Sequence, residues 1–206
     1  MALLSTRTEP ARTLSGRSPL ARVSALLFAL AVSIITAPAE ELSQSAALEY
    51  QVKAAFLYNF AKFVEWPAEK WGDDGSPILV GVLGKDPFGP TLDQTFRGKT
   101  VNGREVVVRR ITGLPEAKRC HILFIGSAEK GQLGEIFHSI GNNGVLTVGE
   151  MRQFAQQGGM INFTTEENKV RLEINVDAAE RSGVKISSKL LKLARVVRDQ
   201  AGDRGN

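Results

Sequence analysis

Three short apolar runs constrain the fold of this chain more strongly than any other feature. They are "PILVGVLG" (77–84), "HILFIG" (121–126) and "GVLTVG" (144–149), and each is rich in Val, Ile or Leu and ends at a glycine. A strand that is apolar on both faces is typical of a parallel sheet covered by helices on both sides. The runs therefore predict an α/β domain.

Helical stretches separate these runs. In "EKGQLGEIFHSIG" (129–141), Leu133, Ile136 and Ile140 share one side of a helix, and "EMRQFAQQGG" (150–159) predicts a short helix ended by two glycines. "GREVVVRR" (103–110) follows an Asn-Gly turn signal and predicts a further strand. Strands separated by helices need crossover connections, which indicate a mainly parallel sheet.

The pattern changes at "MINFTTEENKVRLEIN" (160–175). Val170, Leu172 and Ile174 alternate with polar residues, which predicts an antiparallel hairpin with one buried face. The complete expectation is a three-layer α/β fold with helices on both faces of the sheet. That sheet is mostly parallel, has about five to six strands, and carries the antiparallel hairpin near the C-terminus.

The chain is expected to close with a helix over "ISSKLLKLARVVRD" (186–199), with Ser187 as its N-cap. Its basic side is either a solvated face or a contact for an acidic partner or lipid head groups. The last seven residues (200–206) are expected to be disordered.

The segment "YQVKAAFLYNFAKFVEWP" (50–67) concentrates six aromatic side chains in the seventeen residues before Pro67, although the whole chain is only 7% aromatic. Wound as a helix, it has an apolar arc of roughly 240°, interrupted by Lys53 and Asn59, where a surface helix needs little more than 100°. One sheet cannot cover such an arc.

Three explanations of this helix remain open. It is a central element covered by the sheet and a second helix, or it presents a spare apolar face to another molecule, or its aromatic rings line a pocket for a planar ligand. The residues expected on such an interaction or ligand face are Lys53, Phe56, Asn59, Phe60, Phe63 and Trp66.

The first 39 residues have the three regions of a secretory signal peptide. Four arginines precede an uncharged apolar core, "VSALLFALAVSII" (23–35), and small residues stand at Ala37 and Ala39. The alternative is a membrane anchor, but the core reaches about 20 Å as a helix, short of the roughly 30 Å hydrocarbon layer. We expect export, cleavage after Ala39, and a single periplasmic domain over residues 40–206.

Removal of this leader changes the charge balance. The full chain has 26 Lys and Arg against 22 Asp and Glu, whereas 22 and 21 remain after residue 39. The sequence therefore gives little support to nucleic-acid binding.

The sequence offers no catalytic constellation. Two histidines and one cysteine have no metal-ligand spacing, and the neighbours Cys120 and His121 would point to opposite faces of a strand. "GVLGKDPFG" (81–89) follows a strand, but it lacks the G-x-G-x-x-G fingerprint and is better explained as a turn. We predict no catalytic residue, cofactor or metal, and a binding or regulatory protein that is not an enzyme.

Cys120 is the only cysteine, so an intramolecular disulfide is excluded. Its place before an apolar strand favours a buried, inert thiol. An intermolecular disulfide or a redox-sensing thiol is the alternative.

Several segments together resemble the YfiR-like family of bacterial periplasmic proteins. They are "EYQVKAAFLYNFAKFVEWP", "ILVGVLGKDPFG", "CHILFIG", "VLTVGEM", "FAQQGGMINF", "NKVRLEIN" and "ISSKLLKLARVV". They extend from about residue 46 to residue 197, nearly the whole of the expected mature chain.

This resemblance implies a non-catalytic periplasmic α/β domain that forms homodimers. It implies repression of a membrane-bound diguanylate cyclase through the cyclase's periplasmic sensor region, and thereby lower cyclic di-GMP and less biofilm. Family members that respond to redox state use several cysteines, so disulfide switching within one molecule does not extend to this chain. The alternative function is a sensor for an aromatic or planar small molecule, bound between the aromatic helix and the loops after the parallel strands.

Overall fold

The computed structural model describes residues 37–199, with side chains from residue 44 onward. The chain divides into two compact units, residues 1–44 and 45–206, and the first contributes only the start of one helix to the described residues. Most of the predicted leader and the predicted disorder of residues 200–206 lie outside the described residues.

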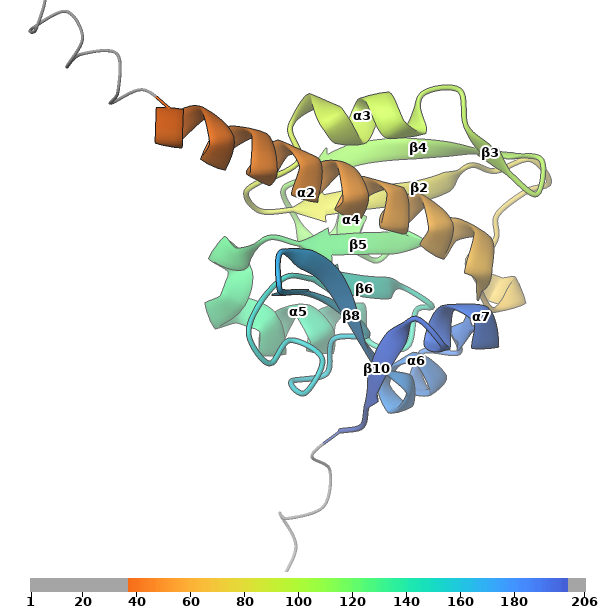
Figure 1. The fold of residues 1–206 in the computed structure, drawn as a ribbon. Helices are drawn as coiled ribbons and strands as arrows, with labels where there is room; N and C mark the ends of the chain where they lie inside the picture. The colour runs from red at the N-terminus through yellow and green to blue at the C-terminus, as the bar shows by residue number, and fades with distance from the viewer. Residues whose placement is uncertain (1–36, 200–206) are drawn as a thin grey trace, which may run out of the picture. The chain divides into compact units, whose positions relative to one another are not determined.

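An eight-stranded sheet is the centre of the second unit, with the strand order β10-β8-β7-β6-β5-β2-β4-β3 (Figure 1). Its strands are β2 (Ile78–Leu83), β3 (Thr100–Val101), β4 (Arg104–Ile111), β5 (Ile122–Ile125), β6 (Leu146–Gly149), β7 (Ile161–Glu166), β8 (Lys169–Asn175) and β10 (Ala194–Val197). Neighbours are parallel except at β7–β8 and β3–β4, which are antiparallel. The predicted α/β class and the hairpin are confirmed, with more strands than expected.

Helices cover both faces of this sheet, as predicted. Residues of α2 (Ala37–Phe63), α3 (Pro90–Phe96), α6 (Val176–Arg181) and α7 (Ser188–Leu191) belong to one apolar cluster, and residues of α4 (Leu114–Ala117) and α5 (Leu133–Ile140) belong to another. In β5, Ile122 and Phe124 belong to the first cluster and Leu123 and Ile125 to the second. Alternation along a strand therefore assigns one cluster to each face.

The aromatic helix ends earlier than expected. α2 stops at Phe63, and the next two residues form β1 (Val64–Glu65), which pairs antiparallel with β9 (Lys185–Ile186) in a small separate sheet. Trp66 and then Pro67 follow β1, and the residue before a proline disfavours helical geometry. Trp66 is therefore held outside the helix.

The predicted C-terminal helix over residues 186–199 is wrong after its first turn. Ser187 is the N-cap, as expected, and its Oγ accepts a hydrogen bond from the backbone N–H of Leu190 at 3.4 Å. The chain leaves the helix after Leu191 and becomes β10, which pairs parallel with β8. The β-branched Val196 and Val197 suit this strand, and the unpaired edge of β8 is available to them.

The predicted short helix at residues 150–159 is also wrong, because this segment forms consecutive turns. The buried ring of Phe154 lies against two glycines. A Cβ atom would approach the ring to 2.7 Å at Gly149 and 2.2 Å at Gly159. The turns therefore fold this segment around one aromatic side chain.

Candidate docking surface

The aromatic rings of α2, and Trp66 after it, are divided between the interior and the surface. Phe60 and Trp66 are buried, while Phe56, Asn59 and Phe63 are partly exposed. Of the residues predicted for an interaction face, the structure therefore leaves three within reach of a partner. Lys53, the sixth, is also buried.

Residues of several elements pack against the aromatic segment. Phe60 stacks on Phe163 of β7, with ring centroids 5.9 Å apart, and Tyr58 meets Phe96 of α3 edge-on at 5.8 Å. The indole N–H of Trp66 donates a hydrogen bond to the carbonyl of His121 at 2.9 Å. The explanation that α2 is a central element holds for these rings, although α3 and the hairpin cover them instead of a C-terminal helix.

Lys53 has a structural task in this arrangement. Its Nζ lies 2.5 Å from a carboxylate oxygen of Glu49 and 2.7 Å from one of Glu150, which follows β6. The hydroxyl of Tyr50 donates to Glu150 at 3.1 Å, and the hydroxyl of Thr165 donates to Glu49 at 3.2 Å. The ammonium group of Lys53 lowers the pKa of Glu49. Lys53, Glu49, Glu150, Tyr50 and Thr165 are together called the Lys53 clasp below. The clasp joins α2 to the carboxyl ends of β6 and β7.

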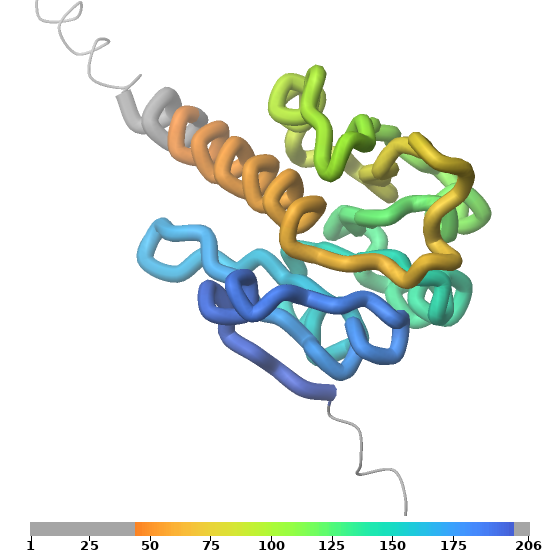
Figure 2. Tube along the Cα trace, turned by 90° about the vertical axis from the view of Figure 1, so that its right-hand side faces the viewer, coloured from red at the N-terminus to blue at the C-terminus, as the bar shows by residue number. Residues whose placement is uncertain are grey.

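A groove lies between the middle of α2 and the β7–β8 hairpin, whose tip is light blue in Figure 2. Its volume is about 520 Å³, and its apolar lining consists of Leu48, Val52, Phe56 and Val170. Leu48 is 61% exposed and Val52 45% exposed. Because Leu48, Val52 and Phe56 are four residues apart, they form one stripe along the helix. The aromatic helix therefore does present an uncovered apolar side, centred before the predicted residues.

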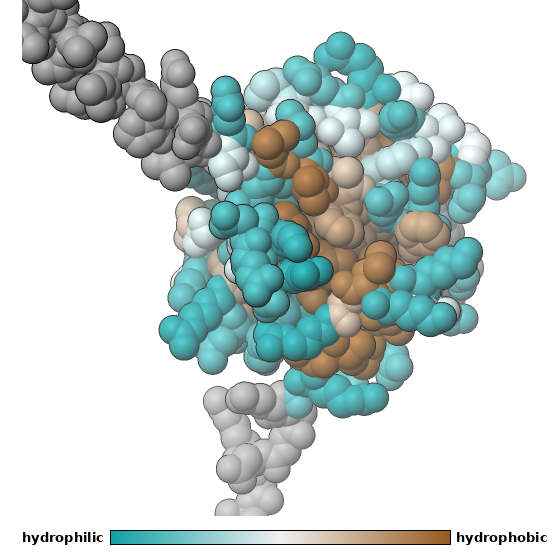
Figure 3. Space-filling view, in the orientation of Figure 1, coloured by the Kyte–Doolittle hydropathy of each residue, from teal (hydrophilic) through white to brown (hydrophobic). Residues whose placement is uncertain are grey.

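This apolar side continues across the sheet to its edge. Val196 of β10 pairs with Ile174 of β8, which belongs to the cluster under α2, so Val196 lies on the same face as that helix. Val196 is 47% exposed. Figure 3 shows the same feature as brown residues that extend from α2 towards β10. Leu48, Val52, Phe56, Val170 and Val196 are called the apolar strip below.

Cations border the strip. Lys169 and Arg171 are exposed and line the groove, and neither takes part in an ion pair within residues 44–199. A partner with apolar side chains and carboxylates beside them would complement this surface.

An aromatic pocket of about 420 Å³ lies at the opposite end of the parallel strands from the predicted ligand site. Trp66, Trp71, Ile78 and Arg104 are among its lining residues, and Ile78 begins β2. The guanidinium of Arg104 lies 4.6 Å from the ring centre of Trp71 and donates a hydrogen bond to a backbone carbonyl. The pocket is therefore at the amino ends of the parallel strands, whereas the sequence suggested their carboxyl ends.

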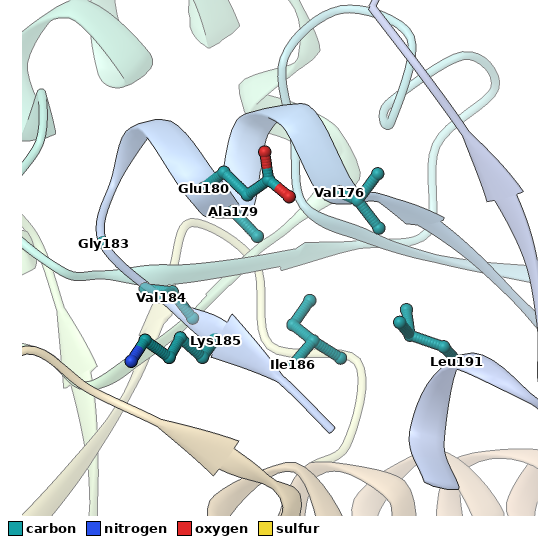
Figure 4. A pocket seen from close by; sticks show the side chains of 8 residues that line it. All are labelled: Val176, Ala179, Glu180, Gly183, Val184, Lys185, Ile186 and Leu191. Atoms are coloured by element: carbon teal, nitrogen blue, oxygen red, sulfur yellow. The ribbon is translucent and has the colours of Figure 1, made fainter. Parts of the chain in front are cut away.

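A further depression of about 360 Å³ lies between α6, β9 and α7 (Figure 4). Val176, Ile186 and Leu191 give it an apolar lining, and Glu180 and Lys185 are its charged residues. The side chains drawn in Figure 4 place no nucleophile beside a base.

His121 and Cys120 are both buried, and they are not arranged as a base beside a nucleophile. The Nδ1 of His121 accepts a hydrogen bond from the backbone N–H of Leu79 at 3.1 Å, and its Nε2 is buried without a partner. Burial lowers the pKa of His121 to about 4 and raises the pKa of Cys120 to about 11. The sulfur of Cys120 faces Gly81, where a Cβ would lie only 2.5 Å away. The thiol is thus placed as an interior packing group.

Two broader observations complete the description of the site. Within residues 44–199, no group of His, Cys, Asp and Glu side chains is arranged to hold a metal ion. Among the described helices, none combines the length and apolar character needed to cross a membrane.

Sequence reasoning missed the two ends of the apolar strip, Leu48 and Val196. Leu48 stands two residues before the aromatic segment, and Val196 was assigned to a helix. The signal for Leu48 was present, because it precedes Val52 by four residues and thus extends the same helical stripe.

Comparison with solved structures gives only weak likenesses. A conserved domain protein from Vibrio cholerae O1 biovar El Tor is 11% identical, with a TM-score of 0.44, over 60% of this chain and 55% of that one. The ABC domain in complex with L-Trp from Streptococcus pneumonia is 11% identical, with a TM-score of 0.43, over 58% and 55%. Each match spans little more than half of the other chain, and neither bears on function.

The sequence profile of the YfiR/HmsC-like family matches residues 50–195. This match runs from the aromatic rings of α2, through every strand of the central sheet, into β10. The chain therefore belongs to the YfiR/HmsC-like family.

Proposed function

We propose that this protein is a periplasmic, non-catalytic regulator that acts by docking on another protein. Membership in the family supports a periplasmic regulator of diguanylate cyclase. The specific proposal is that the protein represses an inner-membrane cyclase by binding its periplasmic sensor region, and so lowers cyclic di-GMP. The apolar strip is the observation that carries this proposal.

The energy available from the strip is adequate for such docking. Burying a large apolar side chain contributes about 1.5–3 kcal/mol when the side chain starts fully exposed, and Leu48, Val52 and Val196 start about half exposed. Association also loses translational and side-chain freedom. The strip by itself therefore supports reversible binding, and contacts from Lys169 and Arg171 would add to it.

The proposal is tested with Leu48→Glu and Val52→Glu, each of which places a charge in the strip without touching the buried core. The matched control is Gln51→Glu, which adds the same charge at an exposed position between them. We expect both strip variants to lose co-purification with the membrane cyclase and to fail to lower cyclic di-GMP in a deletion strain. The control should restore both.

Two results would contradict this function. One is a deletion strain whose cyclic di-GMP is unchanged and whose membranes yield no partner. The other is full repression by the strip variants, which would show that docking uses another surface.

A second candidate function is a sensor for a planar small molecule, favoured by the aromatic pocket. Trp66 and Trp71 are among its lining residues, and Arg104, which lies over the Trp71 ring, offers a cation for a carboxylate. A thermal-shift screen with planar aromatic carboxylates tests it, because a ligand at 100 times its Kd adds about 2.7 kcal/mol of stability. A shift that Trp71→Ala abolishes would support a sensor, whereas no shift with any compound would reject it.

A further inference from the structure

We infer that the end of α7 is a contact surface for the anionic head groups of a phospholipid bilayer, formed by Lys189, Lys192 and Leu193. These three residues are called the α7 basic turn below. They belong to the basic C-terminal segment, for which the sequence left solvent, an acidic partner and lipid head groups as alternatives.

The segment 181–198 carries charge of only one sign. Its eighteen residues include three arginines and three lysines, and no Asp or Glu. Each arginine forms an ion pair with a carboxylate outside the segment: Arg181 with Asp199, Arg195 with Glu173, and Arg198 with Asp177. The three lysines form no ion pair within residues 44–199. The arginines therefore join parts of the fold, whereas the lysines do not.

The three lysines differ in their surroundings. Lys185 lies opposite Glu65 in the β1–β9 pair, so that a carboxylate partly balances its charge. Lys189 and Lys192 lie in and directly after α7, which is at the periphery of the fold (Figure 1). These two lysines are therefore the cations of interest.

Backbone hydrogen bonds hold the α7 basic turn on one side of a single helical turn. The N–H of Lys192 donates to the carbonyl of Ser188 at 3.1 Å, and the N–H of Leu193 donates to the carbonyl of Leu190 at 3.0 Å. At 100° per residue, Lys189, Lys192 and Leu193 fall within an arc of about 100°. Leu190 lies outside this arc, is buried, and fixes the turn to the apolar cluster under α2.

The side chains of the α7 basic turn project into solvent. Leu193 is 66% exposed, more than any other large apolar side chain of residues 44–199, and both lysines beside it are exposed. None of the three hollows described above includes these residues in its lining. The turn is therefore a projecting apolar side chain accompanied by two cations, separate from the apolar strip.

The chemistry of the turn favours a lipid surface over a protein partner. Protein interfaces are enriched in Arg and aromatic residues and depleted of Lys, but here the free cations are lysines and the segment 181–198 has no aromatic residue. Lysine side chains have long apolar stems that let the ammonium group reach anionic head groups, which attract it. An exposed leucine can enter the head-group region of the same bilayer.

Such a contact is weak and reversible. A lysine close to an anionic bilayer raises the membrane affinity about fivefold, and stable anchoring takes stronger signals than two lysines and one leucine. A weak contact is nevertheless useful to a protein whose target lies in a membrane, because it raises the local concentration at that surface.

Vesicle sedimentation tests this surface. The chain from residue 40 onward is used, because it contains the whole second compact unit and lacks the apolar core of the leader. We expect it to sediment with vesicles of phosphatidylethanolamine and phosphatidylglycerol, less so at high ionic strength, and not with vesicles of phosphatidylcholine.

A pair of double variants separates this surface from net charge. Lys189→Gln with Lys192→Gln should lower the affinity for the phosphatidylglycerol vesicles at least about tenfold. The matched control is Lys85→Gln with Lys130→Gln, which removes the same charge from two exposed lysines that follow β2 and β5. The control should lower the affinity less than about twofold.

A fluorophore tests which side of the molecule meets the bilayer. In a Cys120→Ser background, an environment-sensitive dye on Leu193→Cys should shift its emission to the blue with phosphatidylglycerol vesicles. The same dye on Lys130→Cys should not shift. An unshifted dye at residue 193, no binding to these vesicles, or equal loss in the two double variants would overturn the inference.

An acidic protein partner is the other outcome. Loss of co-purification with the detergent-solubilised cyclase in Lys189→Gln with Lys192→Gln, without vesicle binding by the parent, would assign the turn to such a protein and overturn the lipid contact. The vesicles contain no protein, so failure to bind them is separate from failure of the proposed function.

Discussion

At the scale of single residues, His121 is buried as a neutral ring. Its Nδ1 accepts a hydrogen bond, so the remaining proton is on Nε2, and burial lowers the pKa of the ring to about 4 from an ordinary value of 6.5. Between these two pH values the unfolded chain binds a proton that the folded protein does not bind. The free energy of unfolding therefore decreases as the pH falls from 6.5 to 4.

We predict that His121→Asn removes this part of the pH dependence. The asparagine offers an acceptor for the N–H of Leu79 but does not titrate in this range. Urea unfolding at pH 7 and pH 5 should show a smaller loss of stability in the variant than in the parent. The control is His138→Asn at an exposed position, which should keep the parental difference. An unchanged pH dependence in His121→Asn would contradict the assignment.

A second prediction for a single residue concerns the reactivity of the Cys120 thiol. Because its pKa is raised to about 11 and its sulfur is buried, little thiolate exists at neutral pH and access is blocked. A disulfide reagent should react with the folded protein at least about 100-fold more slowly than with the urea-unfolded chain. Leu193→Cys in a Cys120→Ser background is the exposed reference. Rapid labelling of the folded parent would instead favour a redox-active thiol.

At the scale of elements, the Lys53 clasp decides how α2 is held. Removing the cation of a buried ion pair leaves its carboxylates without compensation, and Glu150 is mostly buried. We expect Lys53→Met to lower the free energy of unfolding by about 2–4 kcal/mol. Lys62→Met, an exposed change on the same helix, should stay within about 0.5 kcal/mol.

Neutralising the partners separates charge from packing in this comparison. Adding Glu49→Gln and Glu150→Gln to Lys53→Met should recover part of the loss, because the uncompensated charge is removed. A loss in Lys53→Met no larger than that in Lys62→Met would show that the clasp contributes nothing to stability.

The elements also show what could be predicted from the sequence. Strands β2, β5 and β6 and the β7–β8 hairpin were identified because continuous apolar runs and strict alternation reflect burial directly. The residues of β10 fit a helical stripe as well as a strand, and only the free edge of β8 decides between them. The second partner of Lys53, Glu150, could not be predicted from the sequence, since it lies 97 residues further along the chain.

At the scale of the whole molecule, export is a proposal that can be tested. The predicted cleavage after Ala39 would remove the first three residues of α2. Intact mass spectrometry of a periplasmic fraction should give a product that begins at Glu40, and Ala39→Leu should block its formation. Ala46→Leu, at an exposed position of the same helix, should be processed normally. A product with another N-terminus would correct the cleavage site.

The parallel sheet has a further consequence, for the rate at which the chain folds. Five of the seven neighbouring strand pairs are parallel, so each needs a crossover before its first ladder hydrogen bond can form. Sheets dominated by such distant pairings fold over milliseconds to seconds, far more slowly than helical bundles. An unfolded chain would thus present unpaired strand edges throughout that interval, and chaperones and proteases can bind such edges before the sheet closes.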